Sequence, residues 1–395
     1  MTVEPETTAT RSAPQATGQR HLAYIDGIRG ASACYVVLFH IYQFSSSRFV
    51  GSPPSWWKLF AVFGFGDCGV AVFIVVSGYC LMLPVVATDR MQLRGGWRRF
   101  AERRIRRLGP GYAAALVSSL LLISVVPSLR HHSGTAWDAA LPAFSVGTIA
   151  AHLLLVYNWR LSWRYGIDTP MWTVALEVQI YAVFVVALLP LWRRTIGHRP
   201  NLCVLVVSMI IAGVLMDAGF AWAQPWMLVL FAFGMCAAEA ASRTTRFFSG
   251  RIDRVVVLAL AVVPITFVLA RKRYFSYDGV SFVREVIVGI ATAVLLLALR
   301  KATPANGWFT LWIGNVFSIR PLKWLGQISY SLYLVHFPII GLVALTWVYG
   351  RGFDQPENFA VIVLVGGTVS VLVATGFHSL FERQYLSRRK VAPVV

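Results

Sequence analysis

Residues 59–87 read LFAVFGFGDCGVAVFIVVSGYCLMLPVVA, a run of 29 residues in which Asp67 is the single charged side chain. About 20 predominantly apolar residues are enough for a helix to cross the hydrocarbon core of a bilayer. Comparable runs recur at 22–44, 110–127, 145–158, 172–192, 200–217, 225–241, 255–270, 284–300, 325–349 and 359–381. The pattern predicts an all-α fold, a polytopic bundle of about ten transmembrane helices. The run at 145–158 is shorter than the others and is predicted to be a short or re-entrant helix.

The composition supports the same fold class and excludes several functions. Hydrophobic residues make up 57% of the 395 residues and charged residues 13%, with a mean hydropathy of +0.64. A soluble domain carries about 25% charged residues. The net charge of +19 lies in short clusters between apolar runs, so no basic face is expected for nucleic acid. The five cysteines include no C-x-x-C pair or Cys/His cluster, so neither a disulfide nor a metal site is expected.

The basic residues also predict an orientation in the membrane. If the N-terminus is cytoplasmic and 145–158 does not cross, 25 Lys and Arg residues fall in cytoplasmic segments and nine on the opposite side. Such a bias is typical of cytoplasmic loops. We therefore expect a protein integral to the plasma membrane with both termini cytoplasmic. Residues 1–20 predict a disordered cytoplasmic tail, 21–383 a transmembrane domain, and 384–395 a basic cytoplasmic tail.

The first apolar run contains three ionisable residues, Asp26, Arg29 and His40. Each such group costs roughly 2.5–3.5 kcal/mol on membrane-insertion scales and needs a compensating role. At 100° per residue, Arg29 and His40 lie within about 20° of each other around a helix, and Asp26 within about 60° of both. The stripe is compatible with two interpretations. One is an interhelical ion pair plus a hydrogen-bonded histidine that fixes packing, and the other is a functional site.

Six segments in a fixed order carry a family resemblance. They are Tyr24–Gly30 with His40 eleven positions after Arg29, Gly69–Tyr79, Arg103–Tyr112, Met171–Glu177, Leu325–Pro338 and Phe381–Arg383. Together these segments resemble the motifs of the acyltransferase-3 family of integral membrane acyltransferases. The resemblance extends from residue 24 to 383 and departs from the pattern at Phe337, where a tryptophan is common, and at Gly109.

The resemblance implies an enzyme that transfers an acetyl or other acyl group from acyl-CoA to a hydroxyl. The expected acceptor is a carbohydrate, a glycolipid or a glycosylated metabolite such as a macrolide. The expected partners are acyl-CoA, that acceptor and membrane lipids. Acyl-CoA is a co-substrate, and no permanently bound cofactor is expected.

The resemblance also suggests roles for particular residues. Histidine suits general-base catalysis because its unperturbed pKa lies near neutrality. His40 is the expected base, Arg29 positions the thioester or the acceptor, and Glu177 is a third catalytic candidate. Four arginines are expected to clamp the phosphates of acyl-CoA: Arg103, Arg104, Arg106 and Arg107. Substrate-binding or supporting roles are expected for Asp26, Trp172, Ser329, Tyr330 and His336.

Alternative interpretations remain for several of these features. The arginine cluster also fits a simple topology signal, and His336 and Ser329 also fit a packing network. Ser77, next to Gly78, favours close helix contact over nucleophilic catalysis. The pair His378 and Glu382, spaced i, i+4, is expected to be structural. At the level of function, the intramembrane charges also fit a secondary transporter, and a non-catalytic scaffold would leave the stripe unused.

Overall fold

The protein is a bundle of helices with no β-strand in the part of the chain that the structure describes. In this computed structural model the described residues are 15–47, 55–88, 91–196, 200–243, 252–271, 277–351 and 357–386. A helix satisfies every internal backbone hydrogen bond within its own segment, which is what a lipid environment demands. The predicted all-α fold is confirmed.

The helices follow the predicted apolar runs. The long ones are α1 (Gln15–Ser46), α2 (Asp67–Val86), α3 (Gly96–Val125), α6 (Trp172–Val183), α8 (Pro200–Leu215), α9 (Met227–Ser242), α10 (Ile252–Arg271), α11 (Tyr277–Lys301), α14 (Ser329–Leu342) and α16 (Thr368–Phe377). Short helical turns extend several of these at their ends: η1 (Ser55–Gly64) before α2, η6 (Phe184–Leu188) and α7 (Leu189–Arg194) after α6, η9 (Val343–Val348) after α14, and α15 (Glu357–Val361), η11 (Ile362–Gly367), η12 (His378–Glu382) and α17 (Arg383–Leu386) around α16.

Seven of the described helical segments are long and apolar enough to cross a membrane. Helix α9 is a shorter apolar helix, and α1 and α10 are 32 and 20 residues long. These long helices agree with the predicted polytopic bundle of about ten spans. The short run is confirmed as well, because α4 (Val146–Leu153) has only eight residues, about 12 Å of helix.

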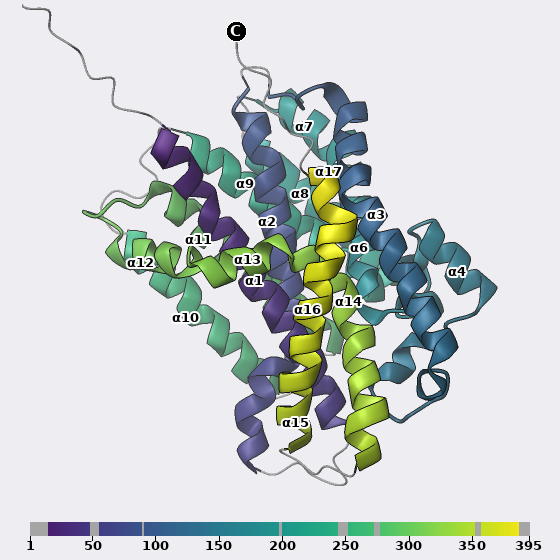
Figure 1. Cartoon of the computed structure of the whole chain (residues 1–395). Coiled ribbons are helices and arrows are strands. Elements are labelled where there is room, and N and C mark those ends of the chain that lie inside the picture. Colours follow the sequence, from purple (N-terminus) through teal and green to yellow (C-terminus); the bar gives the residue numbers. More distant parts are fainter. Residues whose placement is uncertain are drawn as a thin grey trace, which may run out of the picture.

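The chain departs from the predicted layout at two places. The N-terminal tail was predicted to extend to residue 20, but α1 already begins at Gln15, and residues 1–14 lie outside the described part. The predicted basic loop before residue 325 contains two helices, α12 (Trp308–Phe317) and α13 (Arg320–Gln327), which lie across the direction of α14 and α16 (Figure 1). Each helix is too short to span a membrane, so neither forms an apolar run of about 20 residues in the sequence.

Glycines allow the closest helix contacts in the bundle. A Cβ on Gly78 of α2 would lie 2.1 Å from the Phe231 carbonyl oxygen of α9, and one on Gly234 of α9 would lie 2.1 Å from the Val75 oxygen. Small residues at helix interfaces permit such approach in membranes. Gly78 is therefore a packing position, in agreement with the close helix contact predicted for Ser77 and Gly78.

The end of the chain is tied to α14 by polar contacts. The predicted pair is present, with His378 Nδ1 3.0 Å from Glu382 Oε2. Glu382 is buried and also accepts a hydrogen bond from Ser331 of α14. These contacts fix the last helices against α14, so the structural interpretation of this pair is supported.

Candidate functional site

Three cavities follow one another along α1 and α2. The first, here called the arginine cavity, has a volume of about 810 Å³, touches α1 at Tyr24 and includes Arg94, Arg103, Arg104 and Arg300 in its lining. The central cavity has a volume of about 60 Å³ and contains Arg29, Ser77, Glu177, Ser329, Tyr330 and Tyr333. The histidine cavity has a volume of about 610 Å³ and contains His40, Gln43, Asp67, Arg164, Trp172 and Arg284.

The linings on both helices give the same order of cavities. On α2 they include Tyr79 for the arginine cavity, Ser77 for the central cavity and Asp67 for the histidine cavity. On α1 their linings include Tyr24, then Arg29, then His40, so they progress from the start of the helix to its end. The central and histidine cavities share Val70 and Tyr333 in their linings. Two large cavities therefore approach the small central one from opposite directions.

Arg29 lines the central cavity without an ion-pair partner. Among the described residues, no carboxylate oxygen lies within 4 Å of its guanidinium. Among the described residues Arg29 therefore forms no direct interhelical ion pair, although Glu177 and Asp26 lie within its electrostatic range. Asp26 does not line these three cavities, but it lies within electrostatic range of Arg29, Arg107 and Lys323.

Glu177 lies in the central cavity with Arg29 and is anchored by two hydroxyl groups. It accepts hydrogen bonds from Ser77 Oγ, at 3.0 Å, and from the Tyr181 hydroxyl. Ser329 and Tyr330 line the same cavity from α14, where Ser329 Oγ donates to the Gly326 carbonyl at 2.8 Å. Four distant motifs of the sequence thus meet at one point.

His40 lies in the next cavity along α1, with 6% of its surface exposed. Its Nδ1 lies 2.9 Å from Gln43 Oε1. The His336 ring lies 5.1 Å from the His40 ring and the Phe337 ring 5.0 Å, the latter edge-on. Arg29 and His40 thus face the same side of α1, as predicted, but they line successive cavities.

The four predicted phosphate-binding arginines lie in different environments. Arg103 and Arg104 line the arginine cavity. Arg106 is exposed and pairs with Glu102 at 2.7 Å. Arg107 lies within electrostatic range of Arg29 and Asp26. Two arginines that the motifs did not indicate, Arg94 and Arg300, complete the cavity lining.

Sequence reasoning did not identify two arginines of the histidine cavity, Arg164 and Arg284. Arg284 of α11 is 7% exposed, forms an ion pair with Asp67 and lies 4.9 Å from the centre of the Phe65 ring. Arg164 lies 4.2 Å from the centre of the Trp172 ring. Asp67 and Arg284 are 217 residues apart, so no local pattern indicates their pairing. Charged, aromatic and hydrogen-bonding groups therefore line this cavity together.

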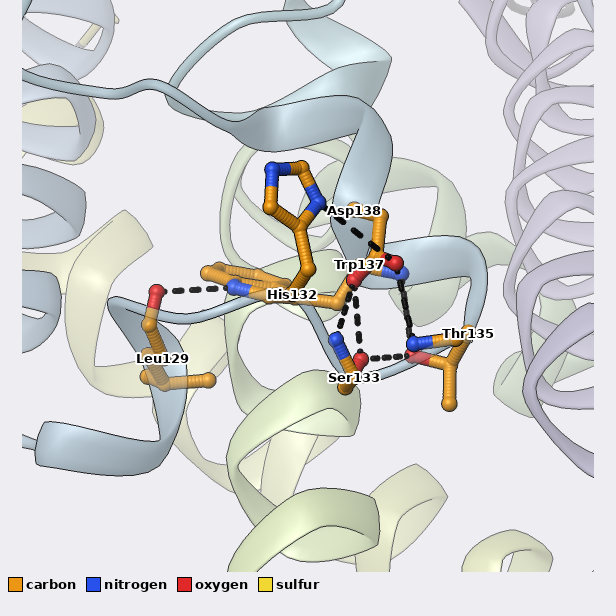
Figure 2. A network of polar contacts seen from close by, with 7 residues as sticks. Leu129, His132, Ser133, Thr135, Trp137 and Asp138 are labelled. Atoms are coloured by element: carbon orange, nitrogen blue, oxygen red, sulfur yellow. Dashed lines mark hydrogen bonds and ion pairs between the residues drawn. The ribbon is translucent and has the colours of Figure 1, made fainter.

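A loop between α3 and α4 closes one wall of the histidine cavity. Ala136 and Ala139 of the turn η3 (Ala136–Ala140) line it. Trp137 is fully buried and donates from Nε1 to the Leu129 carbonyl at 2.9 Å (Figure 2). Its ring also stacks on that of Phe337, with 5.6 Å between the ring centres. Because Phe337 contacts the His40 ring, this loop supports the position of His40.

The loop is held in shape by Asp138 (Figure 2). Its carboxylate accepts hydrogen bonds from the Ser133 N–H at 2.7 Å, the Ser133 hydroxyl at 3.0 Å and the Gly134 N–H at 2.9 Å. Partial burial acts to raise the pKa of Asp138, but these hydrogen bonds outweigh it and the pKa is lowered. Hydrogen bonds to the charged form favour that form.

Because the folded-state pKa is lowered, Asp138 stabilises the loop above the ordinary aspartate pKa of about 3.9, and this contribution is lost as pH falls through the lower folded-state pKa. We expect hydrogen exchange of residues 129–140, corrected for intrinsic rates, to accelerate below that range. Asp138→Ala should accelerate it above that range, where the carboxylate is charged, and change it little below, since each lost hydrogen bond contributes about 0.5–1.5 kcal/mol. Protection that is unchanged in the variant would contradict this role.

The sequence comparisons agree with the motifs and the geometry. The acyltransferase domain family matches residues 22–378, so the chain belongs to this family of acyltransferases. It is 24% identical to the peptidoglycan O-acetyltransferase OatA of Listeria monocytogenes over 89% of this chain and 54% of that protein. It is 28% identical to the putative membrane-bound transacylase BcsY of Komagataeibacter xylinus, over 94% of this chain and 84% of the relative.

A third relative has nearly the same extent as this chain. The acyltransferase MdmB of Streptomyces mycarofaciens is 25% identical over 94% of both chains. By contrast, this chain spans about half the length of the peptidoglycan acetyltransferases it matches. No solved structure matches the chain.

Proposed function

We propose that this protein is a membrane O-acyltransferase that moves an acetyl or other acyl group from acyl-CoA to a hydroxyl of a carbohydrate, glycolipid or glycosylated metabolite. The observation that carries the proposal is the order of the three cavities. A basic cavity at one end and a polar, aromatic cavity at the other approach a small charged centre. A reaction between a phosphorylated donor and a hydroxyl-bearing acceptor needs one cavity for each substrate and a centre where their reacting groups meet.

The donor is assigned to the arginine cavity. Its four arginines suit the phosphates of coenzyme A, because guanidinium groups form strong, directional hydrogen bonds with phosphate oxygens. The positive-inside bias favours a cytoplasmic position for this end of the bundle, and acyl-CoA is made in the cytoplasm. The thin pantetheine arm extends along α1 and passes Arg29, and the acceptor occupies the histidine cavity from the other end.

The proposed reaction is a direct transfer. His40 Nε2 accepts the proton of the acceptor hydroxyl while the hydroxyl oxygen attacks the thioester carbonyl. The new carbon–oxygen bond forms, the carbon–sulfur bond breaks, and the imidazolium returns its proton to the departing thiolate. Arg29 stabilises the negative charge that develops on the carbonyl oxygen or on the sulfur. Glu177, held by Ser77 and Tyr181, balances the Arg29 charge in the resting protein.

The test uses purified protein in phospholipid vesicles with radiolabelled acetyl-CoA and a panel of sugars, glycolipids and glycosylated macrolides. We expect release of free CoA in proportion to the labelled ester formed. Uptake of a panel compound into the vesicles, without CoA release or ester formation, would overturn the proposal and favour a secondary transporter.

A matched pair of arginine variants tests the donor assignment. Arg103 and Arg106 are both exposed and stand three residues apart on α3, but only Arg103 lines the arginine cavity. Arg103→Ala should raise the Kd for CoA by about 10–100-fold, since a charge-assisted hydrogen bond contributes about 1.5–3 kcal/mol. Arg106→Ala should leave that Kd unchanged. An unchanged Kd for both variants in calorimetric titrations would argue that the cluster serves topology only.

A further inference from the structure

The hydrogen bond between His40 and Gln43 determines which ring nitrogen of His40 is available as a base. Both residues are on α1, three positions apart and therefore on one face, and both line the histidine cavity. The Gln43 amide oxygen lies 2.9 Å from His40 Nδ1. A carbonyl oxygen only accepts hydrogen bonds, so Nδ1 carries the proton and Nε2 keeps its lone pair.

Other groups around His40 do not take over this role. The titratable or charged groups that face it across the cavity are Asp67 of α2, Arg164 and Tyr165 at α5 (Leu161–Arg164), Arg284 of α11, and Tyr333 and His336 of α14. Asp67 is engaged by Arg284. Among the described residues, no carboxylate oxygen lies within 4 Å of a His40 ring nitrogen.

The neighbouring histidine is fixed in a matching state. His336 Nδ1 lies 2.9 Å from both the Leu332 and the Tyr333 carbonyl oxygens, so it is the protonated nitrogen. Its Nε2 is buried without a hydrogen-bond partner among the described residues. His336 therefore has no proton on Nε2 to donate to His40, and the lone pair of His40 Nε2 is left for the acceptor hydroxyl.

We propose that Gln43 is a positioning residue for acyl transfer. Its side chain holds the His40 ring so that Nε2 is the base, and it does so with a neutral amide in place of a carboxylate. This inference rests on the proposed function. A neutral partner orients the ring but adds no negative charge that would stabilise the imidazolium. His40 therefore gives its proton back to the leaving thiolate more readily than it would beside a carboxylate.

Kinetics of two substitutions test the inference. Gln43→Ala should lower kcat by roughly 10–100-fold, the usual effect of losing a partner that orients a histidine, with the KM for acetyl-CoA unchanged. Gln43→Glu keeps an acceptor at Nδ1 and adds a charge, so it should restore much of kcat and move the acid limb of the kcat/KM profile to higher pH. Gln384→Ala is the matched control, because Gln384 is exposed and outside the three cavities.

A spectroscopic measurement gives a readout that does not depend on activity. In protein labelled with ¹⁵N-histidine, the His40 signals are those that disappear in His40→Gln. We expect a protonated Nδ1 and a bare Nε2 at neutral pH, and a mixture of the two tautomers in Gln43→Ala. A protonated Nε2 in the unsubstituted protein would overturn the inference.

The outcomes separate this inference from the proposed function. If His40→Ala is inactive while Gln43→Ala keeps its kcat and pH profile, the role of Gln43 is wrong and the function stands. If His40→Ala retains full transfer, the proposed base itself is wrong. One further outcome would also overturn the inference. If Gln43→Ala lowers kcat but Gln43→Glu neither restores kcat nor moves the acid limb of the kcat/KM profile, the role of Gln43 is purely structural.

Discussion

Replacing His40 with alanine will lower the rate of acyl transfer by roughly 10²–10⁴-fold, the usual contribution of a positioned general base. His40 supplies the imidazole that lines the histidine cavity, and its Nδ1 is already held by Gln43. His336 cannot replace it, because its ring is fully buried and its Nδ1 is held by two backbone carbonyls. The measurement is ester formation from labelled acetyl-CoA in vesicles.

Two further variants define the result. His40→Gln keeps most of the side-chain volume and should be as inactive as His40→Ala, which separates loss of the base from loss of packing. His132→Ala removes a histidine that is three-quarters exposed in the loop after α3, and it should retain full activity. An active His40→Gln protein would show that another group accepts the proton.

A single methyl group at Gly326 will destabilise the bundle. A Cβ at this position of α13 would lie 1.9 Å from the Asp26 carbonyl oxygen of α1, and one on Gly27 of α1 would lie 1.6 Å from the Phe317 oxygen. Backbone atoms of two packed helices cannot move aside as a flexible side chain does. Overpacking of this kind costs about 1–3 kcal/mol and sometimes more. We expect Gly326→Ala to lower the thermal unfolding temperature in detergent and to reduce activity, because the contact fixes the segment of α1 that carries Arg29.

Gly376→Ala is the matched control for this substitution. Gly376 is also inside a helix, α16, but a Cβ there meets no atom within 4 Å. Alanine has a better helix propensity than glycine by about 0.8–1.0 kcal/mol, so this variant should be as stable as the parent or more so. If the unfolding temperature fell equally in both variants, the close α1–α13 contact would not be what makes Gly326 important for stability.

The bundle could be predicted from the sequence because a membrane span needs a long apolar run, which is visible locally. The same criterion did not detect α12 and α13. Their ten and eight residues are too short to span, and α12 has tryptophans exposed by 70% and 53%, Trp308 and Trp312, along one side.

The site was predictable in part for a similar reason. Arg29, Glu177 and the pair Ser329 and Tyr330 occur in three separate motifs, and the structure brings them together around the central cavity. Gln43 could have been found from its i, i+3 spacing to His40. The pairing of Asp67 with Arg284 could not, because it depends on how α2 packs against α11 in three dimensions. Helix periodicity predicts on which face of its helix a residue lies, but it does not predict which residue of another helix it contacts.

The small size of the central cavity has a consequence for water. Cavities of about 810 and 610 Å³ approach each other from opposite ends and are separated by a constriction of about 60 Å³ at Arg29. A space of this size holds only a few water molecules, and Arg29 and Glu177 offer them polar partners there. The central cavity therefore keeps the two large cavities from merging into one continuous aqueous path through the bundle.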